Sequence, residues 1–115
     1  MTITLYGIPN CDTVRKARAW LDGRGITYAF QDYKKSGADA AKLAVWCDAQ
    51  GWETVLNRTG TTFKALPEAD RTGLTQATAI TLMLAQPSMI KRPVVEHASG
   101  LLIGFKPVEW DAALI

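Results

Sequence analysis

The chain has 115 residues, of which 48% are hydrophobic and 21% are charged, and its formal net charge is +2. This is ordinary for one globular domain over residues 1–115, and the small net charge predicts no direct binding of nucleic acid or membrane surfaces. The chain has no apolar run near the roughly 20 residues of a membrane-spanning helix, no secretory signal and only two cysteines, so we expect a reducing cytoplasm as its location.

The first third of the chain predicts a strand, a helix and a second strand. Residues 2–6 alternate as a strand does, and residues 11–22 follow with apolar side chains at helical spacing. Residues 26–31 read as the second strand, and residues 34–37 as a polar break. A strand–helix–strand unit of about 30 residues favours parallel strands.

The middle of the chain predicts a block of helices. Residues 38–50 carry an apolar stripe that includes Cys47, and residues 52–56 look like a short helical piece. Residues 57–66 are polar and rich in threonine, and we expect them to form a loop.

A further helix is predicted over residues 75–85. Thr75 is a good N-cap for it, and Pro87 marks its end. At helical spacing, its inward-facing side chains are expected to be Ala77, Ile80 and Leu84.

The last third predicts a hairpin and a final helix. Residues 93–96 and 101–105 have strand character, and a helix is expected to begin near Pro107. The whole order is β-α-β, a helical insertion at about 38–86, and β-β-α. Without the insertion, this is the arrangement of a thioredoxin-like α/β fold with a four-stranded mixed sheet.

Cys11 is the first candidate for chemistry. It follows a predicted strand and turn and lies at the N-terminus of a predicted helix, where backbone N–H groups and the helix dipole favour negative charge. Such a position lowers the pKa of a thiol and yields the nucleophilic thiolate. A cysteine can also be a small buried hydrophobe. The polar neighbours Asn10 and Asp12, with Arg15 and Lys16 one turn along, favour the reactive role.

Four segments, spread in order over the chain, resemble the ArsC family. They are LYGIPNCDTVRKA at 5–17, NRTGTTF at 57–63, IKRPVV at 90–95 and IGFK at 103–106. The family contains glutaredoxin-linked arsenate reductases, Spx-type transcription regulators and a YffB-like branch, to which the segments are most similar. The resemblance implies a thiol-dependent reductase of thioredoxin-like fold.

The resemblance also implies a site. Cys11 matches the cysteine that attacks the oxyanion in the reductases, and Arg58 and Arg92 match two of their arginines, with Pro93 as a cis-proline. Two guanidiniums near a sulfur would stabilise its thiolate and bind an oxyanion or a glutathione carboxylate. Taken alone, each arginine could be a solvated surface charge. The third arginine of the reductases corresponds to Lys106, which keeps the charge but loses the planar fork, and this departure weighs against arsenate.

Further residues of the implied substrate-binding site surround the thiol. They are Asn10, Thr13 and Arg15, together with Pro93 and Lys106. Two cysteines and one histidine at these spacings do not form a zinc site, so we expect no bound metal or cofactor.

The chain lacks a Cys-x-x-Cys motif, because Val14 stands three positions after Cys11. It therefore cannot close the disulfide of an Spx-type redox switch. A mixed disulfide with an outside thiol, most simply glutathione as co-substrate, is the available route. Cys47 is expected to be structural, and a hydrolase pair of Cys11 with His97 is a weaker alternative.

Two functions follow from these observations. The first is a monomeric, glutathione-linked thiol oxidoreductase that acts on a small anionic substrate, with glutaredoxin as a protein partner; arsenate reduction is its narrower version. The alternative is an Spx-like regulator that binds RNA polymerase and performs no catalysis.

Overall fold

The computed structural model describes residues 3–115, apart from the side chain of residue 34. It consists of two compact units. One, which we call the sheet unit, runs through Ser36 and resumes at Arg92. The other, the helical unit, is Gly37–Lys91.

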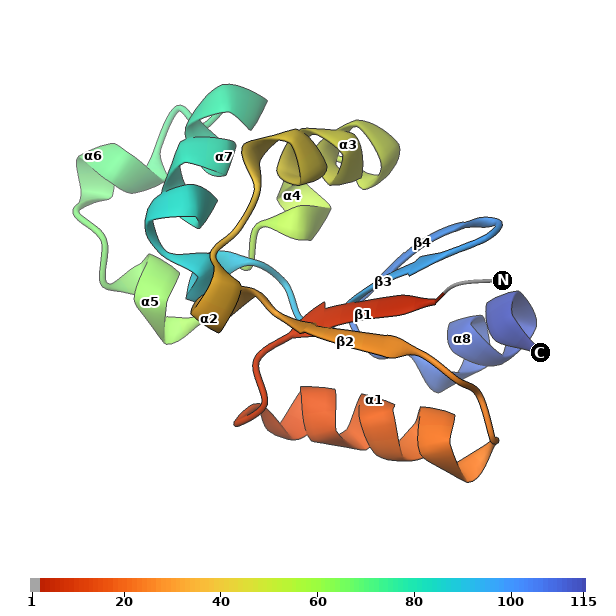
Figure 1. The fold of residues 1–115 in the computed structure, drawn as a ribbon. Coiled ribbons are helices and arrows are strands. Elements are labelled where there is room, and N and C mark those ends of the chain that lie inside the picture. Colours follow the sequence, from red (N-terminus) through yellow and green to blue (C-terminus); the bar gives the residue numbers. More distant parts are fainter. Residues whose placement is uncertain (1–2) are drawn as a thin grey trace. The chain divides into compact units, whose positions relative to one another are not determined.

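The sheet unit is built on a mixed sheet of four strands within the described residues (Figure 1). Its strands are β1 (Thr4–Gly7), β2 (Ala29–Asp32), β3 (Val94–His97) and β4 (Gly100–Ile103), in the order β2-β1-β3-β4. β1 is parallel to β2 and antiparallel to β3, and β3 and β4 form an antiparallel hairpin. The predicted thioredoxin-like α/β fold with a four-stranded mixed sheet is confirmed.

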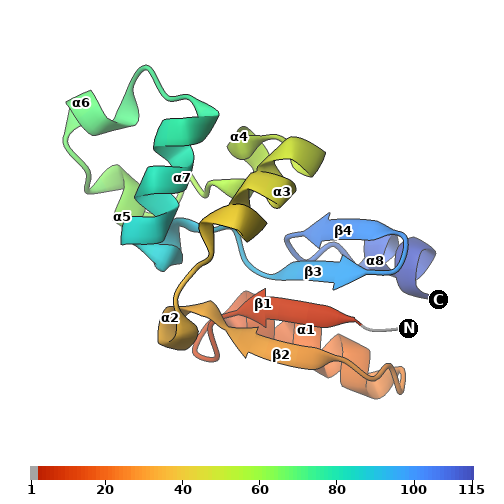
Figure 2. The same ribbon diagram turned by 45° about the horizontal axis from the view of Figure 1, so that its top comes forward.

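Two helices cover one face of this sheet, as Figure 1 and Figure 2 both show. They are α1 (Asp12–Gly23) and α8 (Pro107–Leu114). The apolar face predicted for the first helix is the one that the fold buries. The core between sheet and helices consists of Leu5, Val14, Ala17, Leu21, Val95 and Trp110, all fully buried. This packing holds the N-terminus of α1 in place relative to the strands.

The strand register brings four chain segments to one edge of the sheet. Gly7 at the end of β1 pairs with Asp32 at the end of β2. Val94 at the start of β3 pairs with Ile103 at the end of β4, and with Tyr6 of β1. The residues that follow β1, β2 and β4, and those that precede β3, therefore meet at this edge.

The helical unit contains short helices. They are α3 (Ala40–Gln50), α4 (Trp52–Val55), α5 (Thr61–Lys64), α6 (Glu68–Arg71), α7 (Gln76–Ala85) and the 3₁₀ turn η1 (Pro87–Met89). The helices α3, α4 and α7 contact one another, and η1 contacts α5 and α7. Leu56 forms an isolated antiparallel bridge with Ile90, which joins the end of α4 to the segment after η1.

The face that α7 buries differs from the prediction. Ala79 and Met83 are fully buried, whereas Ala77 is exposed and Leu84 is 39% exposed. The sequence of α7 is QATAITLMLA, with apolar residues around most of its circumference. Periodicity alone therefore does not choose a face, and packing against α3 and α4 makes the choice.

Two segments predicted to be irregular contain a helical turn. The first is α5, within the expected loop 57–66, where the buried Phe63 anchors the turn. The second is α2 (Tyr33–Ser36), which overlaps the expected polar break. Asp32 caps α2, because its Oδ1 accepts the Lys35 N–H at 3.2 Å. Such one-turn helices are too short for a periodic signal. A local side-chain cap fixes α2, whereas α5 has no side-chain cap and depends on the burial of Phe63.

No helix in the described part of the chain combines the length and apolar character that crossing a bilayer requires.

Candidate thiolate site

Cys11 is the N-cap residue of α1. Its backbone is extended, with φ −107° and ψ 126°, and its carbonyl oxygen accepts the Arg15 N–H at 2.9 Å. The Cys11 N–H donates to the Ile8 carbonyl oxygen at 3.3 Å, which closes the turn after β1. The side chain is a free, half-buried thiol. A sulfur thus occupies the place where Ser, Thr or Asp commonly caps a helix.

The surroundings of Cys11 favour its thiolate. The side chain makes no full capping hydrogen bond, although the Val14 and Thr13 N–H groups are close enough to act on its pKa. Burial raises the pKa of Cys11, but hydrogen bonding from the Val14 N–H, a hydrogen bond and the positive charge of Arg92, and the Thr13 N–H together outweigh it. The net effect holds the pKa below the ordinary thiol value of 9.0. Helix N-termini and adjacent cations act on thiols in this direction.

Arg92 links Cys11 to a third side chain. Its guanidinium hydrogen-bonds to the sulfur of Cys11 and also to the side chain of Tyr33. Tyr33 is only 3% exposed. Burial raises the pKa of the Tyr33 hydroxyl well above its ordinary value. The Arg92 charge and hydrogen bond oppose this effect, and the negative charges of Cys11 and Asp32 add to it. We call Cys11, Arg92 and Tyr33 the thiolate cluster.

Sequence reasoning missed Tyr33. The residue lies between the predicted strand 26–31 and the predicted polar break 34–37, and no motif marks it. A topological signal was available, because Tyr33 follows directly on the second strand of a parallel pair. The residues after parallel strands meet at one edge of the sheet, so a side chain there reaches the residues that follow β1.

The other predicted residues of the sheet unit lie around the same edge. Asn10 and Thr13 are exposed in the turn and first helical turn beside Cys11. Arg15 forms an ion pair with Asp12 on the surface of α1. Pro93 is buried, and the peptide bond that joins it to Arg92 is cis, which agrees with the expectation from the resemblance.

Lys106 is the N-cap residue of α8 and is exposed. Its Nζ lies 3.6 Å from Oε2 of Glu109, one turn along the same helix. The Gly104 N–H donates to the Pro93 carbonyl oxygen at 2.8 Å, which fixes the segment before Lys106 at the cluster's edge of the sheet.

Arg58 belongs to the helical unit. It is exposed in a turn that Asn57 stabilises, where Oδ1 of Asn57 accepts the Thr59 hydroxyl at 2.9 Å. The Arg58 guanidinium carbon lies 5.6 Å from the centroid of the Trp52 ring. Its approach to Cys11 stays a prediction.

The hydrolase pair of Cys11 with His97 finds no support in the geometry. His97 closes the β3–β4 turn, where its Nδ1 accepts the Ser99 N–H at 3.3 Å. This is the end of β3 opposite to Arg92, so His97 is not placed to serve Cys11. Among residues 3–115, no group of three His, Cys, Asp or Glu side chains is arranged to hold a metal ion.

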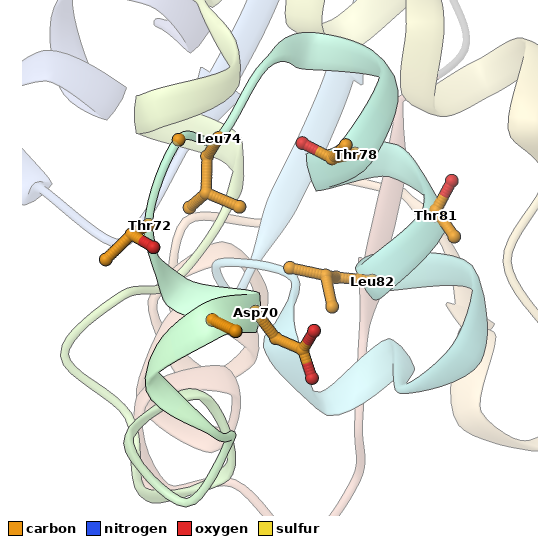
Figure 3. A pocket seen from close by; sticks show the side chains of 8 residues that line it. Asp70, Thr72, Leu74, Thr78, Thr81 and Leu82 are labelled. Carbon is orange, nitrogen blue, oxygen red and sulfur yellow. The ribbon is translucent and has the colours of Figure 1, made fainter.

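The helical unit contains a pocket of its own beside α6 and α7 (Figure 3). Asp70 is the one charged residue in its lining, and Leu74 and Leu82 supply apolar surface. The lining includes neither Arg58 nor Cys47. Cys47 is instead 2% exposed on α3, where burial and the negative charge of Asp48 raise the pKa of its thiol.

Known proteins share the fold of this chain. A profile of the ArsC family matches residues 6–113. The chain belongs to the ArsC family. The solved structure of the YffB protein is 56% identical with a TM-score of 0.96, covering 99% of this chain and 100% of that one. An arsenate reductase (ArsC) related protein from Brucella melitensis is 54% identical with a TM-score of 0.79, covering 97% of this chain and 93% of that one.

Curated relatives within the family differ in what is known of them. An uncharacterized protein of Haemophilus influenzae is 38% identical over 111 residues, which are 96% of this chain and 97% of that protein. The global transcriptional regulator Spx of Listeria innocua is 27% identical over 109 residues, which are 93% of this chain and 82% of that protein. The ArsC family chain thus has both reductase-related and regulator relatives.

Proposed function

We propose that this ArsC family chain is a cytoplasmic, monomeric thiol-dependent oxidoreductase with Cys11 as its nucleophile. The observation that carries the proposal is the position of Cys11 at the N-terminus of α1, where the Val14 N–H and Arg92 hold its pKa below the ordinary thiol value. A thiol with these neighbours is a thiolate more often at neutral pH than a free cysteine is. The thiolate is the form that attacks disulfides and oxyanions.

The proposed reaction is thiol–disulfide exchange through one cysteine. The Cys11 thiolate attacks the glutathione sulfur of a mixed disulfide; a new S–S bond forms to Cys11, the substrate's S–S bond breaks, and the substrate thiolate takes a proton from water. The thiolate of a glutathione molecule then attacks the bond at Cys11. This step releases glutathione disulfide and restores the Cys11 thiolate. In total, the sulfur of the incoming glutathione is oxidised to disulfide and the substrate sulfur is reduced to a thiol, while the transferred glutathione sulfur stays at the disulfide level.

Arg92 has two functions in this proposal. It stabilises the thiolate before attack, and its remaining N–H groups bind a carboxylate of glutathione or a small anionic substrate. We propose Arg58 as a second arginine for the same anion, with Asn10, Thr13 and Arg15 beside it and Pro93 and Lys106 at the rim. Glutaredoxin is the proposed protein partner in the second step: its thiolate attacks the glutathione sulfur bound to Cys11, takes the glutathione as its own mixed disulfide and restores the Cys11 thiolate.

Arsenate reduction is the narrower version of this proposal. The Brucella melitensis relative supports it through its description as arsenate reductase related. The residue that corresponds to the third arginine is Lys106, whose ammonium group pairs with Glu109 at 3.6 Å. A lysine lacks the planar fork for an oxyanion. We therefore favour a glutathione mixed disulfide over arsenate as the substrate.

The test compares two alanine variants that each remove one thiol. Reduction of a glutathionylated peptide by glutathione is measured, with and without glutaredoxin, for the unsubstituted chain, Cys11→Ala and Cys47→Ala. In each condition we expect Cys11→Ala to fall to the rate measured without this chain, and Cys47→Ala to keep its activity because Cys47 is buried with a raised pKa. Equal activity of Cys11→Ala and the unsubstituted chain would contradict the proposal. Arsenate replaces the peptide in a parallel assay.

We propose as a second candidate an Spx-like regulator that binds RNA polymerase and performs no catalysis. The similarity to Listeria innocua Spx over most of this chain supports it. The chain lacks the second cysteine of a Cys-x-x-Cys pair, which removes only a disulfide switch and leaves binding open. Purified polymerase is mixed with this chain and the complex is analysed by size-exclusion chromatography. Stoichiometric co-elution, retained by Cys11→Ala, supports the regulator; separate elution opposes it.

A further inference from the structure

We infer that Tyr33 is a positioning residue that holds the Arg92 guanidinium against the Cys11 sulfur. The inference rests on the proposed function and adds to it a residue that strengthens the nucleophile without touching the substrate. Three observations carry it: the hydrogen bonds that join the thiolate cluster, the burial of Tyr33, and the cap that fixes its backbone.

The hydrogen bonds of the cluster have only one possible direction at Arg92. A guanidinium carries five N–H donors and no acceptor. Arg92 must therefore donate both to the Tyr33 hydroxyl oxygen and to the Cys11 sulfur. Because the planar Arg92 guanidinium makes these two hydrogen bonds, its orientation is restricted. The Tyr33 oxygen thus acts on the thiolate through the arginine.

Tyr33 is itself held firmly. Its side chain is 3% exposed, and the short helix α2 that carries it contacts β1 and β2. Asp32 fixes the start of α2, because its Oδ1 accepts the Lys35 N–H at 3.2 Å and its carbonyl oxygen accepts the Ser36 hydroxyl at 2.9 Å. The buried side chain and the capped backbone therefore place the phenol oxygen as an acceptor at the edge of the sheet where Cys11 and Arg92 meet.

Arg92 needs such an anchor. Its side chain is half-buried, and an arginine side chain has about 2 kcal/mol of rotamer entropy to lose when it is fixed. A guanidinium that leaves the sulfur part of the time stabilises the thiolate less. Removal of the Tyr33 oxygen should therefore weaken the thiolate although the charge of Arg92 remains.

Tyr33 supports Arg92 as a neutral group. The charged groups that act on Tyr33 are Arg92, the Cys11 thiolate and Asp32. Burial, the largest effect, raises the pKa of Tyr33, so the phenol stays protonated around neutral pH. A phenolate would compete with the thiolate for the positive charge, whereas a neutral oxygen only orients it.

The test measures the rate of Cys11 alkylation by iodoacetamide against pH, in a Cys47→Ala background. We expect Tyr33→Phe to lower the rate at neutral pH by about two- to tenfold and to move the midpoint of the profile to higher pH. In an Arg92→Gln background, Tyr33→Phe should cause no further change, because there is no guanidinium left to hold. An unchanged profile for Tyr33→Phe, or an equal effect with and without Arg92, would overturn the inference.

The matched control is Tyr28→Phe. The Tyr28 hydroxyl oxygen also accepts from an arginine, Nε of Arg18, at 3.0 Å. Tyr28 immediately precedes β2 and Tyr33 immediately follows it, so the control removes the same chemical group at the other end of the strand. We expect the Cys11 profile of Tyr28→Phe to match the unsubstituted chain. A shift as large as that of Tyr33→Phe would indicate general loosening of the fold and would overturn the inference.

The same profiles separate this inference from the proposed function. If the alkylation midpoint of Cys11 is lowered in the unsubstituted chain and Tyr33→Phe does not change it, the positioning role of Tyr33 is refuted but the proposed function is not. A midpoint at the ordinary thiol value in the unsubstituted chain refutes the thiolate site and both proposals with it. A midpoint that responds to Tyr33→Phe, in a chain that reduces no mixed disulfide, supports the positioning role and opposes the proposed reaction.

Discussion

Gly7 and Val14 approach each other so closely that only glycine fits at the end of β1. A Cβ atom on Gly7 would lie 2.9 Å from Cγ2 and 3.2 Å from Cγ1 of Val14. Val14 is fully buried in the core and supplies one of the N–H groups that stabilise the Cys11 thiolate. The contact therefore fixes the distance between the strand and the N-terminus of the helix that carries the thiol.

Gly7→Ala is expected to destabilise the protein by about 1–3 kcal/mol, because a methyl group is forced against a rigid β-branched side chain in a filled core. Urea unfolding measures the change. Gly23→Ala is the control, since a Cβ there meets no atom within 4 Å and alanine favours the helix α1. Equal stabilities of Gly7→Ala and Gly23→Ala would contradict the close approach.

Substitutions of Arg92 should raise the pKa of Cys11 by amounts that depend on the charge and shape of the new side chain. Arg92→Lys keeps the positive charge but loses the planar fork, and Arg92→Gln loses the charge as well. We expect the pKa of Cys11 to rise from the unsubstituted chain to the lysine variant and further in the glutamine variant. The pH dependence of alkylation reports this order. A lysine variant with a higher Cys11 pKa than the glutamine variant would contradict it.

Tyr33 should make the folded state sensitive to alkaline pH. Its pKa in the folded state is raised above the ordinary 10.0. Above that pH the unfolded chain releases the phenol proton and the folded chain keeps it, so the free energy of unfolding falls. The slope for this group is at most about 1.4 kcal/mol per pH unit. Its stabilisation is fully present below 10.0 and is lost as the pH rises toward the folded-state pKa.

This prediction is checked by comparing the unsubstituted chain with Tyr33→Phe, which lacks the ionisable group. Urea unfolding on both sides of pH 10.0 should show a steeper decline for the unsubstituted chain than for the variant. The other tyrosines contribute equally to both proteins and cancel. Parallel declines would mean that the Tyr33 phenol ionises as it does in an unfolded chain.

The two cysteines should differ in reactivity in the folded protein. Cys11 is half-buried with a lowered pKa, whereas Cys47 is 2% exposed with a raised one. Under native conditions we expect iodoacetamide to modify Cys11 first and Cys47 only when the helical unit opens. Mass spectrometry of peptides over time measures both. In denaturant, the difference between the alkylation rates of Cys11 and Cys47 should disappear. Comparable rates for the two cysteines under native conditions would contradict the prediction.

Arg58 should contribute to anion binding under the proposed function. Arg58→Gln is expected to raise KM for an anionic disulfide by about two- to tenfold while the Cys11 alkylation profile changes less than in Arg92→Gln. Arg71→Gln is the control. Arg71 is another exposed arginine of the helical unit, and its Nε donates to the Leu66 carbonyl oxygen at 2.9 Å. An unchanged KM in Arg58→Gln would remove Arg58 from the site.

The helical unit shows where sequence patterns fail. Thr75 is the N-cap of α7 and accepts a hydrogen bond from the Thr78 N–H at 3.3 Å, as its side-chain chemistry predicted. The predicted inward face of the same helix is wrong for Ala77 and Leu84, which are exposed, whereas Ile80 is half-buried; the fully buried residues are Ala79 and Met83. A cap depends on residues within one turn, but a helix that is apolar all round receives its buried face from its neighbours.

The sequence by itself determined the sheet-and-helix order, the buried face of α1 and the place of Cys11 at its N-terminus. These features depend on the spacing of apolar side chains and on turns within a few residues. Only the tertiary structure joined Tyr33 to Arg92 and Cys11. The three residues are distant in the chain and meet because the β1–β2 and β1–β3 registers bring three strand ends to one edge. Register is a long-range property, and no local pattern around Tyr33 encodes it.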